Sequence, residues 1–218
     1  MGLEYHLSLG DWTAVRTDLE NGRIDMLMGL FRSRSRDRHV DFSTPHSIVS
    51  HTVFTHKDSD IHTEEDLYGK EILVQTGDIV HDYLQRNPIT DSLIPVVDQR
   101  QALLLLDEGY HDAAFLSKLQ GIYFMDQMHL EHVRTVDIEL IPQRYCFAVQ
   151  EGDAELQAVL NEGLNIIKLN GTYEEIYDRW FGVLERQNTS RQIRRTALPI
   201  AALTVAVIAL LVAWTWSL

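Results

Sequence analysis

A nearly continuous apolar run, Ile24–Leu30, follows a helix-like segment and limits the fold more than any other part of the sequence. In that segment Trp12 and Leu19 recur at helical spacing, and Gly22 is a typical helix stop. An apolar run of this length is typical of a strand buried on both faces. Leu3–Leu9 alternates like a strand, so the order strand, helix, strand predicts a parallel pair.

The same alternation continues along the chain. Short apolar runs bounded by turn residues predict strands, and longer periodic segments after capping residues predict helices. The predicted strands are 52–55, 71–75, 95–97, 112–116 and 145–150, and the predicted helices are 79–85, 99–108, one after Asp153 and one after Thr172. This pattern predicts the α/β class.

The loop after Ile24–Leu30 carries the first candidate for function. Ser33 is placed to cap a short helical turn that carries Arg36. Taken alone, Arg36 is either one of four arginines in a solvated loop or an anion-binding group at the end of a strand. Backbone N–H groups and a forked guanidinium can together hold a carboxylate at such an edge.

Composition excludes several classes of function. The net charge of -13 argues against a nucleic-acid partner, which needs a basic surface. The single cysteine, Cys146, allows no intrachain disulfide and lies in a strand-like run, where it is expected to be a small buried residue. The ten histidines show no metal-ligand spacing, so we expect no metal and no cofactor.

The segment Ala197–Leu218 contains no charged residue. At helical rise it would be about 33 Å long, enough for a hydrocarbon layer of roughly 30 Å. Trp214 and Trp216 lie near one end, as interfacial tryptophans do. We therefore predict a transmembrane helix at 196–218, after a polar linker at 183–195, with a buried core helix as the alternative.

Several spaced motifs resemble one family in their order. The block around Arg36 begins with L-x-x-G-x-x-D. It continues with a hydroxyl residue, an arginine, a valine and the motif F-S-x-P. Later blocks fit D-L-x-G-K, G-x-x-D-A and G-T-Y-x-x-I-Y-x-x-W-F-G. The matching positions are Leu19, Gly22, Asp25, Ser33, Arg36, Val40, Phe42, Ser43, Pro45, Asp66, Leu67, Gly69, Lys70, Gly77, Gly109, Asp112, Ala113 and 171–182. Over residues 3–182 the chain resembles bacterial solute-binding proteins of family 3, the two-lobed polar amino-acid binders.

The resemblance implies a two-lobed periplasmic-binding-protein-like fold over residues 1–182. Lobe 1 would comprise 1–55 and 143–182, and lobe 2 would comprise 56–142. Family members begin with a further strand and helix before the position of Leu3. We therefore expect the chain to be a fragment whose lobe 1 lacks that first strand.

The resemblance also implies a ligand site between the lobes. Arg36 would bind a carboxylate, and the other expected ligand-binding residues are Gly29, Phe31, Ser33, Gln75, Gly77, Asp78, Ile79 and Ser117. Ser117 stands where amino-acid binders carry an aspartate for the ammonium group, and Phe31 and Asp78 replace hydroxyl residues. Asp78 is either a helix cap or a new source of negative charge, so an organic acid stays as open as an amino acid.

Three functions remain open. The first is an extracytoplasmic sensor domain on the bacterial inner membrane, single-pass, with a kinase or cyclase module beyond the span and a homodimer through the membrane helix as one arrangement. The second is a substrate-binding protein of an amino-acid transporter. The third is an enzyme of the same fold, a dehydratase or lytic transglycosylase, although no catalytic residues are indicated. Four arginines at 186–195 precede the span, and the positive-inside rule read locally would reverse this topology.

Overall fold

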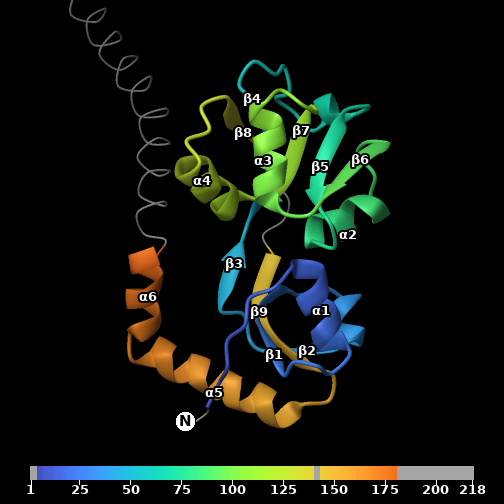
Figure 1. Ribbon diagram of the computed structural model, residues 1–218. Helices are drawn as coiled ribbons and strands as arrows, with labels where there is room; N and C mark the ends of the chain where they lie inside the picture. Colours follow the sequence, from blue (N-terminus) through green and yellow to red (C-terminus); the bar gives the residue numbers. More distant parts are fainter. Residues whose placement is uncertain (1–3, 140–142, 181–218) are drawn as a thin grey trace, which may run out of the picture. The chain divides into compact units, whose positions relative to one another are not determined.

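The computed structural model describes residues 4–139 and 143–180 of the chain. Residues 1–165 form one compact unit, which contains two β-sheets, and a second unit begins at Ile166. The two sheets have separate strand sets and lie in different parts of the first unit (Figure 1). The α/β class expected from the sequence is confirmed.

The first sheet has four strands arranged around β9. All three of its partners run antiparallel to β9: β1 and β2 flank it, and β3 pairs with its N-terminal end. The strands are β1 (Met26–Phe31), β2 (Val40–Phe42), β3 (Ser47–Val49) and β9 (Gln143–Gln150). Helix α1 (Trp12–Glu20) packs on this sheet, and Leu19 joins a core with Leu30, Phe42 and Ala148.

The predicted strand at Leu3–Leu9 and its parallel pairing with Ile24–Leu30 are wrong. Residues 4–10 form no strand, and Tyr5 and Leu9 are almost fully exposed. A strand exists only where a neighbour takes its hydrogen bonds. Among the described residues no strand pairs with this segment, and β1 pairs with β9 instead. Alternation alone therefore did not determine structure here.

The second sheet has five strands in the order β6-β5-β7-β4-β8. Strands β5, β6 and β7 are parallel, whereas β4 runs antiparallel to both β7 and β8. Its elements are β4 (His51–His56), η2 (Glu65–Leu67), β5 (Glu71–Gln75), α2 (Ile79–Arg86), β6 (Ser92–Val96), α3 (Gln99–Asp107), β7 (Ala113–Ser117), α4 (Lys118–Gln127) and β8 (Val133–Glu139).

Alternation along β5 divides the core of this sheet in two. Ile72 and Val74 pack on one face with residues of α2, and Leu73 packs on the other face with residues of α3. Helices α3 and α4 also pack against each other on that second face (Figure 1). The central strands are thus covered on both faces, as their continuous apolar runs require.

Two chain segments connect the sheets. One passes from β3 through Ser50 to β4, and the other lies between β8 and β9 and includes residues outside the described part. The expected lobe boundary at residue 55 falls inside β4, all of which pairs in the second sheet. The sheet boundary lies near Ser50, because β4 needs the neighbours β7 and β8 on both edges.

After β9 the chain forms α5 (Ala154–Leu169) and α6 (Thr172–Trp180). The Asp153 carboxylate accepts a hydrogen bond from the N–H of Leu156, as predicted for the cap of α5. Among the described residues no helix has the length and apolar composition that a membrane span requires. The predicted linker at 183–195 and span at 196–218 lie outside the described residues.

Candidate ligand-binding site

Arg36 lies in the short helical turn η1 (Arg36–Arg38), after β1, and is almost completely buried. Ser33 supports this turn: its carbonyl accepts from the N–H groups of Arg36 and Asp37, and its hydroxyl lies 3.4 Å from the nitrogen of Arg36. The Arg36 guanidinium turns back to donate from Nη1 to the carbonyl of Phe31 at 3.1 Å. The turn therefore directs a buried cation away from solvent.

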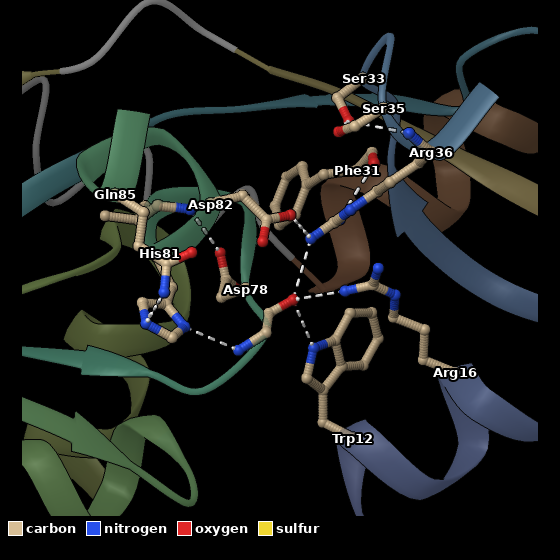
Figure 2. A network of polar contacts seen from close by, with 12 residues as sticks. Trp12, Arg16, Phe31, Ser33, Ser35, Arg36, Asp78, His81, Asp82 and Gln85 are labelled. Atoms are coloured by element: carbon tan, nitrogen blue, oxygen red, sulfur yellow. Dashed lines mark hydrogen bonds and ion pairs between the residues drawn. The ribbon is translucent and has the colours of Figure 1, made fainter. Parts of the chain in front are cut away.

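The other end of the guanidinium reaches the second sheet (Figure 2). Nη2 of Arg36 donates to the carbonyl of Gly77 at 2.9 Å and to Oδ2 of Asp82, also at 2.9 Å. Gly77 precedes α2, and Asp82 lies in its first turn. Arg36 therefore joins the first sheet to the β5–α2 connection of the second.

The carbonyl of Gly77 accepts from two further donors of the first sheet's half. Nε1 of Trp12 lies 3.1 Å from it and Nη1 of Arg16 lies 3.2 Å away, both projecting from one face of α1 (Figure 2). Gly77 has a φ of +71°, a left-handed conformation that favours glycine. This backbone conformation presents the carbonyl to all three donors.

Aromatic rings form one wall beside this network. The ring of Phe31 lies 4.8 Å from that of His51 and 4.6 Å from that of Tyr145, centre to centre. Neither ring nitrogen of the buried His51 has a hydrogen-bond partner among the described residues, and its Nε2 lies 3.8 Å from Oδ1 of Asp78. Burial raises the pKa of Tyr145, and the negative charge of Asp78 acts in the same direction.

Positively and negatively charged side chains lie close together in this site. Burial lowers the pKa of the Arg36 guanidinium, while Asp82 and Asp78 oppose this effect and Arg16 adds to it. The Asp78 side chain is buried and caps α2 by accepting from the N–H of Val80 at 3.1 Å. Two carboxylates and two guanidiniums can therefore compensate one another or a charged ligand.

The structure brings most of the predicted site residues together. Phe31, Ser33, Arg36, Gly77 and Asp78 belong to the polar network and its aromatic wall (Figure 2). Whether they bind a ligand stays a prediction.

The remaining predicted residues lie around this network. A Cβ on Gly29 would lie 2.3 Å from the ring of Tyr145, so glycine permits that ring to pack on β1. The carbonyl of Gln75 accepts from the N–H of Asp78, Ile79 is buried in the core of the second sheet, and Ser117 is buried opposite His51 in the β4–β7 pairing.

Five residues of the network were missed at the sequence level. They are Trp12, Arg16, His51, Asp82 and Tyr145. Three of them had a visible signal: Trp12 and Arg16 lie four positions apart on α1, and Asp82 lies four positions after the cap Asp78. His51 and Tyr145 enter the site through ring contacts with Phe31, which the sequence does not indicate. Within the described residues no group of three or more His, Cys, Asp or Glu side chains could hold a metal ion.

Two α/β halves joined by connecting segments are the arrangement of two-lobed binding proteins, which close around ligands at such hinges. The family described as bacterial extracellular solute-binding proteins, family 3, matches residues 1–183. The chain belongs to this family, and its fold is periplasmic-binding-protein-like.

Individual relatives agree with this assignment. The amino-acid-binding protein AabA of Dichelobacter nodosus is 28% identical over 182 residues, which cover 82% of this chain and 71% of that protein. A histidine kinase sensor domain similar to periplasmic binding proteins is 36% identical, with a TM-score of 0.77 and coverage of 80% of this chain and 77% of its own. An ancestral arginine-binding protein bound to arginine is 26% identical, with a TM-score of 0.76 and coverage of 83% and 81%.

Proposed function

We propose that this chain is a binding domain for an amino-acid-like ligand whose carboxylate is held by Arg36. The observation that carries the proposal is the burial of Arg36. Only 1% of its side chain is exposed, and its guanidinium lies between the two sheets, which share no strand. Such a group can bind a carboxylate through paired N–H donors with little competition from water. Family membership and the names of the relatives support a small-molecule ligand of this class.

The acidic side chains favour a ligand that also carries a positive charge. Ser117 offers no charge for an ammonium group, but Asp82 pairs with Arg36 at 2.9 Å and Asp78 caps the same helix, α2. A simple dicarboxylate would place further negative charge beside them, which is costly in a buried site. An amino acid is therefore a better fit than an organic acid.

For the biological role we propose a sensor domain of a membrane-bound signalling protein. The histidine kinase sensor domain supports this, since it is 36% identical and has the same fold. The uncharged segment at 196–218 supports attachment to the membrane, with the two lobes placed outside. The second candidate is the binding component of an amino-acid transporter, favoured by relatives such as an arginine-binding protein of Escherichia coli, 28% identical over 163 residues.

The binding proposal is tested by thermal unfolding with a panel of L-amino acids, starting with arginine, glutamine and cystine. A ligand that binds only the folded protein raises the unfolding temperature. We expect Arg36→Ala to weaken that binding at least about tenfold, because hydrogen bonds to a charged group are lost. The matched control is Arg38→Ala, which removes an exposed arginine from the same turn.

Equal stabilisation of Arg36→Ala and Arg38→Ala by the same ligand would show that Arg36 is not part of the binding site.

The placement of the lobes is tested separately by adding protease to intact cells that express the full protein. Digestion of the domain is the expected result, and complete protection would place it in the cytoplasm.

A further inference from the structure

Asp82 occupies part of the surface of Arg36 that a ligand carboxylate needs. Its Oδ2 lies 2.9 Å from Nη2 of Arg36, and the pair joins α2 of the second sheet to the η1 turn beside the first. Among the described residues the Asp82 side chain makes no other hydrogen bond. The contact is therefore specific to this pair of residues.

A count of donors shows what remains for a ligand. The guanidinium has five N–H donors in a planar fork. Nη2 donates its two to Gly77 and to Asp82; Nη1 donates one of its two to Phe31; Nε is buried and its N–H has no partner among the described residues. Nε and Nη2 form one edge of the fork, the edge that binds a carboxylate side-on. On that edge Nε has no hydrogen-bond partner among the described residues, whereas Nη2 is occupied by Asp82 and Gly77.

We infer that Asp82 is an internal competitor for the carboxylate-binding edge of Arg36, so that a ligand carboxylate must displace it. The inference rests on the proposed function of Arg36. A binding-competent state that is populated only part of the time weakens the observed affinity by that fraction. Asp82 thus lowers the affinity of the site for a carboxylate by competing for Arg36.

The surroundings of Asp82 allow it to leave. Its side chain is 24% exposed, so water can solvate the carboxylate once it separates from Arg36. It lies in the first turn of α2, where the helix dipole favours a negative charge. The capping of α2 does not depend on it, because Asp78 performs that role. By contrast, Arg36 is buried and tied to Phe31, so it stays in place.

Acetate is the probe that tests competition, because it is a carboxylate with no other recognition group. Thermal unfolding is followed during an acetate titration of the wild type, Asp82→Asn and the control Asp91→Asn, which removes the same charge from an exposed loop position. The double variant Arg36→Ala/Asp82→Asn measures the non-specific effect of the salt, which is subtracted. We expect the half-saturating acetate concentration to fall about tenfold in Asp82→Asn and to stay unchanged in Asp91→Asn.

An unchanged or higher half-saturating concentration in Asp82→Asn overturns the inference, as does the absence of a saturable response in every protein. Failure of the proposed function gives a different result. In that case the amino-acid panel gives no stabilisation of the wild type, while acetate still distinguishes Asp82→Asn from the wild type.

Discussion

At the scale of single residues, His51 is the least compensated polar group of the site. Its side chain is fully buried, and neither ring nitrogen has a hydrogen-bond partner among the described residues. Burial lowers the pKa of His51; the nearby carboxylate of Asp78 opposes this and Arg36 reinforces it. The ring of Tyr145 closes the same aromatic wall from β9. The folded protein therefore favours a neutral imidazole.

This imidazole predicts a pH dependence of stability. Above the unfolded-state pKa of about 6.5 the ring is neutral in both states, and stability is complete. Below it the unfolded chain binds a proton that the folded protein does not, so the free energy of unfolding falls as pH decreases towards the folded-state pKa, by up to about 1.4 kcal/mol per pH unit. Chemical denaturation at pH 7.5 and 5.5 measures the change.

We expect His51→Gln to lose less stability across that interval than the wild type. The control is His6→Gln, an exposed position for which the pH dependence stays that of the wild type. If the free energy of unfolding falls equally in His51→Gln and the wild type between pH 7.5 and 5.5, His51 does not cause the pH dependence.

Local structure was predicted correctly where the signal is local. Ser33 and Arg36 lie in one turn, and Asp78 caps its own helix, as their spacing indicated. That these residues bind a ligand stays a prediction. Asp82 meets Arg36 across the two sheets, whereas His51 of β4 meets Asp78, which follows β5 of the same sheet. Nothing in the local sequence specifies these partners, because each contact depends on how distant strands pack.

At the scale of elements, central strands and capped helices followed the sequence closely. The predicted strand 71–75 is β5 residue for residue, and the predicted helix 99–108 is α3 with one residue fewer. Asp98 caps α3 by accepting from the N–H of Gln101, a local signal. In contrast, α4, β2, β3 and β8 were not predicted. Two of these strands have only three residues, and their pairing with β9 creates them.

The contact between α4 and β4 gives a prediction at this scale. A Cβ on Gly121 of α4 would lie 2.3 Å from Cζ of Phe54, whose side chain is completely buried in β4. Alanine normally favours a helix over glycine, but overpacking here should destabilise the protein by about 1–3 kcal/mol. Urea denaturation of Gly121→Ala measures the loss.

Phe54→Leu should relieve the overpacking, because leucine is smaller than the phenylalanine ring that a Cβ at position 121 would meet. In the double variant Gly121→Ala/Phe54→Leu the loss should be smaller than the sum of the two single losses. A purely additive result would mean that the two positions do not compete for the same space.

At the scale of the first unit, Phe31 ties the two sheets together. It belongs to β1 of the first sheet, yet it packs in the core of the second with Val53 and Ile79. Polar contacts from Trp12, Arg16 and Arg36 converge nearby. These contacts couple the two halves, so we expect residues 1–165 to unfold in a single transition.

Phe31→Ala should weaken that coupling. Replacing a buried phenylalanine by alanine lowers the free energy of unfolding by about 3–5 kcal/mol. Here the lost packing is between the two halves. Scanning calorimetry should then resolve two transitions. The control is Phe42→Ala, which removes the same side chain from the core of the first sheet alone. If both variants keep a single transition, the halves are coupled by other contacts.

Sequence signals alone were enough to predict the α/β class, the family, the central strands and the candidate arginine. These depend on local periodicity, on capping residues and on motifs that keep their order along the chain. Three features depend on the three-dimensional packing: residues 4–9 form no strand, β4 belongs wholly to the second sheet, and Asp82 forms an ion pair with Arg36. Each of these depends on a neighbour distant in sequence, because a strand or an ion pair forms only where its partner is present.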